Sequence, residues 1–589
     1  MNEKPHIFSR RFQLPIFRTV DTTIRSLSLT GKVVFYTLAT LFIISALGML
    51  WQVNSAFLVE VPREGGALTE GVIGSPRFVN PVLSVTEGDK DISALVYSGL
   101  MRLMPNGTLG NDLADKHTVS PDGKIYTFTI RPNAVFHDGT PVTADDVVFT
   151  VRKIQDKAVK SNKQAQWEGI LVDKTVDNEV RFTLPQAYAP FLENTTIGIL
   201  PKHLWEPLLG DQFMNSNLNI RPIGSGPFIV ETVDTNESGS PVMYTLAPFE
   251  KYYFGKPYIE QIIFKFFTTE KSLIEAYQAG EINAMNGISS ENAIVLKQTG
   301  APMLQSALPR IFAVFFNQTT NKVLAYKEVR QALSLGLNRQ TVVDNVLDGF
   351  GSPLDSAVPK SFTNEVQSEF TDSQALQASS DHASSTLAAI NLLEQNGWQL
   401  NANGIREKKV GNDSIVLSFS ISTSDAPELK EVAELVIAEW KKLGADVSVK
   451  VVEGGYLNQN IIKPRRYDAL LFGQVVNRDL DLYAFWHSSQ RADPGLNVAL
   501  YENKTVDTIL EQMRVEISFN KRRELYQKFE TELSKDVPAV FIYSPRFIYV
   551  VPQALHREEI HEVSTPSERF STVSSWYLRT DKVWKIFAK

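Results

Sequence analysis

The stretch that decides the fold is Val135–Phe149, which has the sequence VFHDGTPVTADDVVF. A turn is expected at its Asp-Gly pair, and Thr143 is placed to cap the helix that follows. Asp145 and Asp146 then face the positive end of the helix dipole. The two carboxylates are therefore expected to be helix-start residues, with a metal or acid/base role as the alternative.

The segments on either side of this stretch predict alternating strands and helices. Upstream, residues 120–123 (SPDG) form a turn, and Ile125–Ile130 alternates large apolar residues with threonine, as a half-buried strand does. Far downstream, Asp425 is expected to cap a helix with Pro427 in its first turn, and residues 447–451 follow as a strand. Helix-then-strand units of this kind predict an α/β architecture.

An uncharged apolar run, Val33–Trp51, is long enough to cross a bilayer. Six basic residues and two acidic residues precede it, so the N-terminal side is expected to stay in the cytoplasm. We therefore predict a cytoplasmic segment over 1–32, a transmembrane anchor over 33–53 and a stalk over 54–64, with the bulk of the chain outside the membrane. A cleaved signal peptide is the competing interpretation.

Composition excludes several classes of protein. The chain of 589 residues is too long for one core and predicts two or three globular units. Its lack of cysteine excludes disulfides, thiolate metal sites and a lipid-modified cysteine. Beyond the apolar run the net charge is about −11, which argues against nucleic-acid binding.

Several short sequence motifs, called words below, each occur once and follow one another in a characteristic order along nearly the whole outer part of the chain. They are residues 76–81 (PRFVNP), 95–100 (LVYSGL), 135–149, 221–228 (RPIGSGPF), 329–334 (VRQALS), 338–339 (NR) and 387–398, which ends in NGW. In this order they resemble the bacterial extracellular solute-binding proteins, family 5, the peptide, oligopeptide and nickel-binding proteins of ABC transporters.

The resemblance implies a bilobed α/β fold of the periplasmic-binding-protein type II with an extra domain, behind the one N-terminal helix. It implies lobe I over 65–96, 220–311 and 548–589, an inserted domain II over 97–219, and lobe III over 312–547. It further implies a monomer that captures a peptide or another small solute between its lobes and delivers it to a transporter permease. A sensor of the same fold that does not transport is an alternative.

No catalytic constellation stands out in the chain. Gly224-Ser225-Gly226 lacks the spacing of a nucleophile elbow, and Pro227 interrupts the helix that such an elbow needs. We therefore expect no enzyme activity, no cofactor and no metal site. An anchored surface hydrolase is the less favoured third alternative.

The site residues follow from the resemblance, because the peptide ligands of the family pair their backbone with one segment from each lobe. Carried over by position, these segments are Val85, Thr86 and Glu87 in the first lobe and Gly473, Gln474, Val475 and Val476 in the second. In many members of the family an aspartate shortly after the second segment holds the α-amino group of the ligand. A strict alignment puts Val476 or Asn477 at that position, and Asp479 lies close to it.

Four side chains after these segments have open roles. Asp479 or Asp481 is a candidate countercharge for the α-amino group of the ligand. Trp486 is a candidate cleft aromatic, with core packing as the equal alternative, and the neighbouring His487 either binds a ligand carboxylate or lies at the surface.

Overall fold

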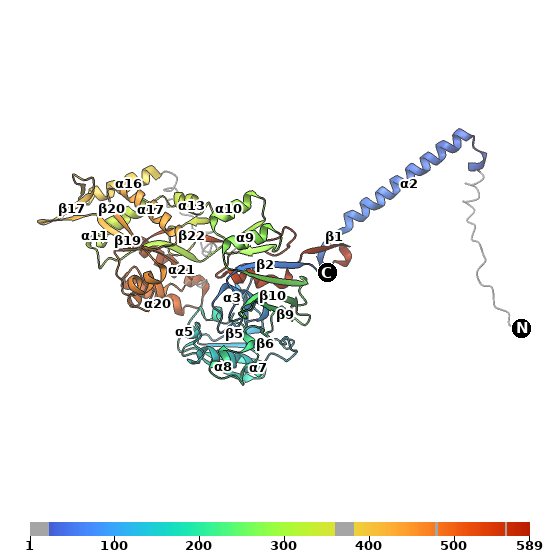
Figure 1. Ribbon diagram of the computed structural model, residues 1–589, viewed down its shortest axis with the longest axis horizontal. Helices are drawn as coiled ribbons and strands as arrows, with labels where there is room; N and C mark the ends of the chain where they lie inside the picture. The colour runs from blue at the N-terminus through green and yellow to red at the C-terminus, as the bar shows by residue number, and fades with distance from the viewer. Residues whose placement is uncertain (1–22, 360–381, 477–480, 560–561, 589) are drawn as a thin grey trace. The chain divides into compact units, whose positions relative to one another are not determined.

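The computed structural model describes residues 23–359, 382–476, 481–559 and 562–588 (Figure 1). The chain forms two compact units. One comprises residues 1–63 with 579–589, and the other comprises residues 64–578.

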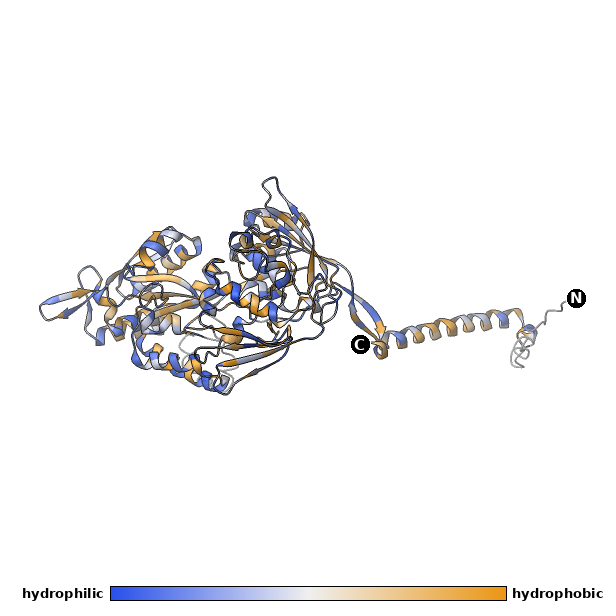
Figure 2. Ribbon diagram, turned by 90° about the horizontal axis from the view of Figure 1, so that it is seen from below, coloured by the Kyte–Doolittle hydropathy of each residue, from blue (hydrophilic) through white to orange (hydrophobic). Residues whose placement is uncertain are grey.

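The first unit is built on helix α2, Leu29–Phe57, whose N-terminus is capped by the Ser28 hydroxyl accepting a hydrogen bond from the Gly31 N–H. None of its residues is buried, and its length and composition suffice to cross a membrane. Orange and pale residues make up most of the helix in Figure 2. The predicted apolar span thus lies within one continuous helix.

A two-stranded antiparallel sheet follows α2 and joins the two ends of the chain. Strand β1, Leu58–Arg63, pairs with β23, Arg579–Trp584. The segment 54–64 was expected to be a stalk, but it holds the last turn of α2 and a paired strand. Residues 579–589 were expected in lobe I, yet they fold with this N-terminal segment, because β1 supplies the backbone partners of β23.

The second unit is organised around a mixed twelve-stranded sheet. Its ten-strand path runs β20 (Asp446–Val452), β19 (Ser418–Ser424), β21 (Ala469–Val475), β14 (Arg310–Phe316), β22 (Ala539–Val550), β12 (Ala284–Asn286), β2 (Ala67–Ile73), β11 (Gln261–Phe267), β10 (Pro241–Pro248) and β9 (Phe228–Thr235). Strands β13 (Met303–Ala307) and β15 (Gly351–Pro353) pair with β22 beside this path.

Strand β22 is common to both halves of this sheet. Its first half, through Tyr543, pairs with β14, and its second half, through Val550, pairs with β12 and β13. The chain crosses between the halves a second time where β13 ends at Ala307 and β14 begins at Arg310. The two halves are therefore joined by two neighbouring backbone crossings, the arrangement of a hinge.

A smaller antiparallel sheet lies in the part of the chain inserted between β2 and β9. Its order is β5 (Ala114–Val119), β6 (Ile125–Ile130), β8 (Glu179–Thr183) and β7 (Leu171–Val176). Strand β6 confirms the predicted alternation, since Tyr126, Phe128 and Ile130 are buried. Two further small sheets pair β3 (Met101–Leu103) with β4 (Leu109–Asn111), and β16 (Trp398–Leu400), β17 (Arg406–Val410) and β18 (Asp413–Val416) with one another.

Helices cover these sheets. The longer ones are α3 (Glu87–Val96), α4 (Ala144–Gln155), α9 (Glu270–Gln278), α10 (Ser290–Gln298), α12 (Lys327–Leu335), α13 (Arg339–Val346), α16 (His382–Gln395), α17 (Pro427–Lys442), α20 (Lys504–Val515) and α21 (Phe519–Asp536). The short helices near the site are α5 (Gln164–Trp167), α6 (Phe191–Asn194), α19 (Tyr483–Trp486) and the 3-10 helix η5 (Pro566–Ser575).

Of the two predicted helix caps, the one at the start of α4 is found and the one at the start of α17 is not. Thr143 caps α4, and the Asp146 carboxylate accepts hydrogen bonds from the Thr143 N–H at 2.8 Å and the Lys202 N–H at 2.8 Å. Asp146 is therefore scaffold, as expected. The prediction that Asp425 caps α17 was wrong, since Ala426 occupies the capping position and the Pro427 ring starts the helix.

Trp486 is a core residue and not a cleft aromatic. Its side chain is 1% exposed and packs against the rings of Phe315, Tyr501, Phe529 and Phe541. Of the two roles left open by the sequence, packing is the one found. The reason is that α19 turns the indole toward the face of the sheet covered by α20 and α21.

Three fully buried charged residues, Glu70, Asp91 and Arg569, form one cluster. The guanidinium donates to both carboxylate oxygens of Asp91, at 2.8 and 2.7 Å, and to the Glu70 carboxylate. The hydroxyl of Tyr549 donates to Glu70 Oε2 at 2.8 Å, and the Asn286 amide donates at 3.0 Å to Glu70 Oε1, the oxygen that Arg569 also contacts. The cluster joins β2, α3, β12, β22 and η5, and every charge in it has a partner.

We predict that Arg569→Met lowers the free energy of unfolding by about 3–5 kcal/mol, because it leaves two buried carboxylates without a countercharge. Lys256→Met is the control, since Lys256 pairs with Glu64 at the surface, and it should cost no more than about 1 kcal/mol. Denaturant unfolding of both variants measures the difference. Equal losses would show that the buried cluster does not stabilise the fold.

Trp486→Ala should also destabilise the unliganded protein, by about 3–5 kcal/mol, because it opens a cavity among buried rings. Tyr456→Ala removes an aromatic ring that is 54% exposed in the same half of the unit and serves as the control. Thermal unfolding of the empty protein is the measurement. An unchanged melting temperature for Trp486→Ala would contradict the core assignment.

Candidate functional site

A cavity of about 500 Å³ lies where the two halves of the second unit face each other. One wall is α3 with the segment Tyr97–Leu103 after it, and a second wall is η5. Residues around α5 and α6 line it from the inserted part of the chain. Val475 and Val476, at the end of β21, line it from the opposite half. A volume of this size is in the range of small-molecule and short-ligand sites.

Several buried polar atoms on the cavity wall lack a hydrogen-bond partner. They are the hydroxyls of Ser93, Tyr97 and Ser571 and the Nε of Arg102. Ser93 and Tyr97 are less than a tenth exposed, and burial raises the pKa of Tyr97 so that it stays a neutral donor. Buried polar groups are normally paired, so these four atoms are exceptions among the residues that line the cavity.

The charged groups on the wall differ in how well they are compensated. Burial raises the pKa of Asp112 to about 6, although the Tyr253 hydroxyl donates to it at 2.6 Å. Lys90 pairs with Glu87 at 3.2 Å. Burial, assisted by the positive charge of Lys90, lowers the pKa of Lys163 to about 8.

Two of the sequence words pack together beneath the cavity. His137 of the VFHDG stretch accepts a hydrogen bond from the Gly224 N–H at Nδ1 and lies 3.0 Å from the Gly226 carbonyl through Nε2. Burial lowers the pKa of His137 to about 4, so it is neutral. A Cβ on Gly224 would lie 2.1 Å from the Val96 carbonyl oxygen. The glycines are therefore required for the loop to approach the end of α3.

The first predicted segment lies at the start of α3 and does not line the cavity. Thr86 caps α3 by accepting a hydrogen bond from the Asp89 N–H, and Glu87 begins the helix and pairs with Lys90. Val85 is 60% exposed. Their neighbour Ser84 does line the cavity.

Of the second predicted segment, Val475 and Val476 line the cavity. Gly473 and Gln474 lie in β21, where Gly473 faces the Phe312 ring and the Gln474 amide donates to the Leu496 carbonyl at 3.2 Å. Asn477 and Asp479 lie outside the described residues. Trp486, in the core, does not line the cavity.

Asp481, the other candidate for an amine countercharge, is already engaged. It accepts a hydrogen bond from the Tyr188 hydroxyl at 3.2 Å and lies 3.3 Å from the Arg514 Nε. The Ala189 N–H donates to the Arg514 carbonyl at 2.9 Å. These contacts connect the inserted part of the chain with α20 of the opposite half, so Asp481 joins the two sides of the cavity.

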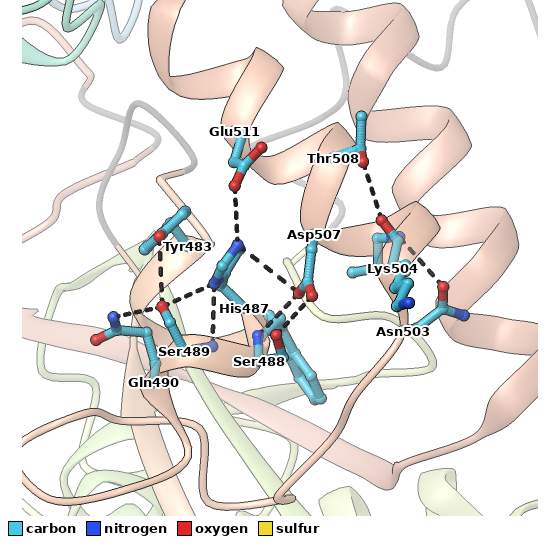
Figure 3. Close-up of polar contacts among 12 residues, drawn as sticks. Tyr483, His487, Ser488, Ser489, Gln490, Asn503, Lys504, Asp507, Thr508 and Glu511 are labelled. Carbon is cyan, nitrogen blue, oxygen red and sulfur yellow. Dashed lines mark hydrogen bonds and ion pairs between the residues drawn. The ribbon is translucent and has the colours of Figure 1, made fainter.

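His487 belongs to a polar cluster away from the cavity (Figure 3). The Ser489 N–H donates a hydrogen bond to His487 Nδ1 at 3.1 Å, and the Ser489 hydroxyl lies 2.8 Å from the same nitrogen. The other ring nitrogen, Nε2, lies 3.4 Å from the Glu511 carboxylate. The Asp507 carboxylate accepts hydrogen bonds from the Ser488 N–H and hydroxyl. His487 is 7% exposed, and its side chain caps the short 3-10 helix that follows it. It is therefore a structural residue, and neither of the two predicted roles, ligand partner or surface residue, is found.

Four residues of the wall were missed by sequence reasoning: Ser93, Arg102, Lys163 and Ser571. A fifth, Tyr97, lies inside the word LVYSGL, so only its side-chain role was missed. Lys163 and Ser571 carry no local signal, because nothing in their neighbourhood in the sequence distinguishes them from ordinary surface residues.

Comparison with known proteins assigns the fold and the family. Residues 108–495 match the model of the bacterial extracellular solute-binding proteins, family 5. The oligopeptide-binding protein AppA of Bacillus subtilis is 27% identical, over 88% of this chain and 92% of that protein. The nickel-binding periplasmic protein of Escherichia coli is also 27% identical, over 82% of this chain and 89% of its own length.

A solved structure agrees with these sequence matches. The structure of AppA from Bacillus subtilis in complex with a nonapeptide superposes with a TM-score of 0.65 at 26% identity. The superposition covers 88% of this chain and all of that chain. The order of the sequence words, the bilobed mixed sheet and these matches agree, and the chain belongs to the bacterial extracellular solute-binding proteins, family 5.

Proposed function

We propose that this protein captures peptides in the cavity between its two halves and passes them to the permease of an ABC transporter. The observation that carries the proposal is the cavity of about 500 Å³, which is lined from both halves of the unit by residues that carry aromatic rings and hydroxyl groups. Peptides suit such a wall, because their backbone offers a donor and an acceptor at every residue. The relatives that bind oligopeptides support the same class of ligand.

The two halves would close on the peptide by bending at the two crossings near Ala307 and in the middle of β22. We propose the lobe boundaries given by the resemblance, except that lobe I ends at Leu578, with domain II over 97–219 contributing the α5 and α6 wall. The segments Val85–Glu87 and Gly473–Val476 remain proposed as backbone partners of the peptide, with Asn477 or Asp479 at the position of the amine partner. Ligand binding would favour the closed form, which a permease then recognises.

We further propose that α2 remains in the mature protein as a membrane anchor. Its 29 residues exceed the roughly 20 that span a bilayer, and basic residues precede it in the sequence. An anchor of this kind would replace the lipid-modified cysteine that this chain lacks and would keep the binding unit close to its transporter.

Peptide capture predicts that the purified full chain carries a mixture of short peptides, which native mass spectrometry would detect and denaturation would release. Ala94→Trp should abolish this co-purification, because Ala94 is an exposed residue of α3 on the cavity wall. Ala388→Trp, on the exposed face of α16, is the matched control and should keep its peptides. If Ala94→Trp retains the same peptides, ligands bind elsewhere.

Anchoring predicts that the chain stays with the membrane after alkaline carbonate washing and that its intact mass includes residues 29–57. A chain starting at Leu58 behind a cleavable leader should instead be released in soluble form. A mature mass that lacks α2 would establish a signal peptide and would refute the anchor, while leaving peptide capture unaffected.

A further inference from the structure

Three large apolar side chains are exposed together in the first unit of the chain. Trp584 ends β23, and Ile586 and Phe587 lie in the short 3-10 helix η6, Lys585–Phe587, that follows it. The side chain of Ile586 is 77% exposed, and that of Phe587 is 72% exposed. Adjacent apolar residues with this exposure are typical of a surface that contacts a partner molecule or a membrane.

The pairing of β1 with β23 places these side chains beside the end of α2. Leu58, the first residue after α2, is the partner of Trp584 in the sheet, so η6 continues past the last turn of the helix. The Trp584 indole N–H donates to the side-chain oxygen of Asn54 at 2.7 Å, which holds the ring against that turn. In Figure 2 the chain end marked C lies beside the end of α2 that leads into β1.

The length of α2 sets the level of this contact relative to a bilayer. The uncharged run 33–51 rises through roughly 28 Å, close to the hydrocarbon thickness of about 30 Å. Asn54 follows Trp51 by three residues, a rise of roughly 4–5 Å. When the run crosses the hydrocarbon, Asn54 and the Trp584 ring bonded to it therefore lie in the headgroup region.

The residues of the segment 584–587 have the chemistry that this level favours. A tryptophan ring combines an apolar body with an N–H donor, and tryptophan is enriched where hydrocarbon meets water. Ile586 and Phe587 supply apolar surface, and the ammonium group of Lys585 suits lipid phosphates. The exposed rings of Trp51 and Phe57 on α2 flank the same level.

We propose that the segment 584–587 is a second membrane contact in the extracytoplasmic leaflet. Ile586 and Phe587 insert between the acyl chains, while Lys585 faces the lipid phosphates. The inference rests on the proposed retention of α2 as an anchor and adds to it a lipid-binding role for the residues after β23. Both strands of the β1 and β23 pair are then attached to the membrane at one end.

The test is the depth of a fluorescent label on the full chain in vesicles of phosphatidylcholine and phosphatidylglycerol. The chain has no cysteine, so Phe587→Cys creates a unique labelling site. Ile44→Cys, within α2, reports on the anchor, and Ser238→Cys, in the exposed turn between β9 and β10, reports on water. Quenchers attached high on the acyl chain should quench the label at 587, quenchers attached deep should quench the label at 44, and the label at 238 should keep its fluorescence.

The outcomes separate the second contact from the anchor. A quenched label at 44, with a label at 587 as bright as that at 238, would overturn the second contact and leave the anchor standing. Labels that escape quenching at both 44 and 587 would show that α2 does not enter the bilayer, and both proposals would then fail.

A further pair of variants distinguishes insertion by the protein from insertion by the label. Ile586→Asp combined with Phe587→Cys should lose the quenching, because an ionised carboxylate does not enter hydrocarbon. Ile586→Leu combined with Phe587→Cys is the matched control and should keep it. Position 586 is exposed, so neither change disturbs a packed core. Quenching that persists with Ile586→Asp would mean that the label alone enters the membrane, which would contradict the inference.

Discussion

The buried pairing of Arg569 with Glu70 and Asp91 is the constraint on which the rest of the binding unit depends. It brings together residues that are far apart in the sequence, from strand β2 to the 3-10 helix η5. Moving these charges out of water is costly, so the cluster persists only because each oxygen finds a donor. Its members α3 and η5 are also two walls of the cavity. The position of Asp91 thus fixes the helix face that carries Ser93.

The shared strand β22 determines how the two halves can move. It places Tyr543 against β14 in one half and Tyr549 against the Glu70 carboxylate in the other. Because Tyr549 is held by the buried cluster, the second half of β22 cannot shift without breaking a charged network. In the hinge motion that we propose, bending is concentrated between these residues, around Pro545, where a proline lacks the N–H that would stiffen the sheet. The cavity lies where such bending changes the distance between its walls.

Local chemistry could be predicted from the sequence, and side-chain environment could not. The turn, strand and cap around Val135–Phe149 depend on residues within a few positions, and they were found where expected. The order of the sequence words gave the family. Trp486 shows the limit: burial depends on α20 and α21, which follow it in the chain, so its core position has no local signal. Lys163 shows the same limit for a charged residue. Whether a carboxylate lies near its ammonium group depends on the folded cavity, and residues adjacent to it in the sequence give no indication of this.

The protein contains charged groups of two kinds: those of the Arg569 cluster are fully paired, and one on the cavity wall is not. Beneath the cavity, Arg569 has a full set of carboxylate partners, and the Glu70 oxygens accept from Tyr549 and Asn286 as well. On the wall above, Lys163 and the hydroxyl of Tyr97 are left without partners. An unpaired buried group costs free energy in the empty protein, and a ligand that pairs it recovers that cost as affinity. The satisfied cluster ties α3 and η5 to the central sheet, so the part of the wall that these two elements form is held in place by contacts within the protein.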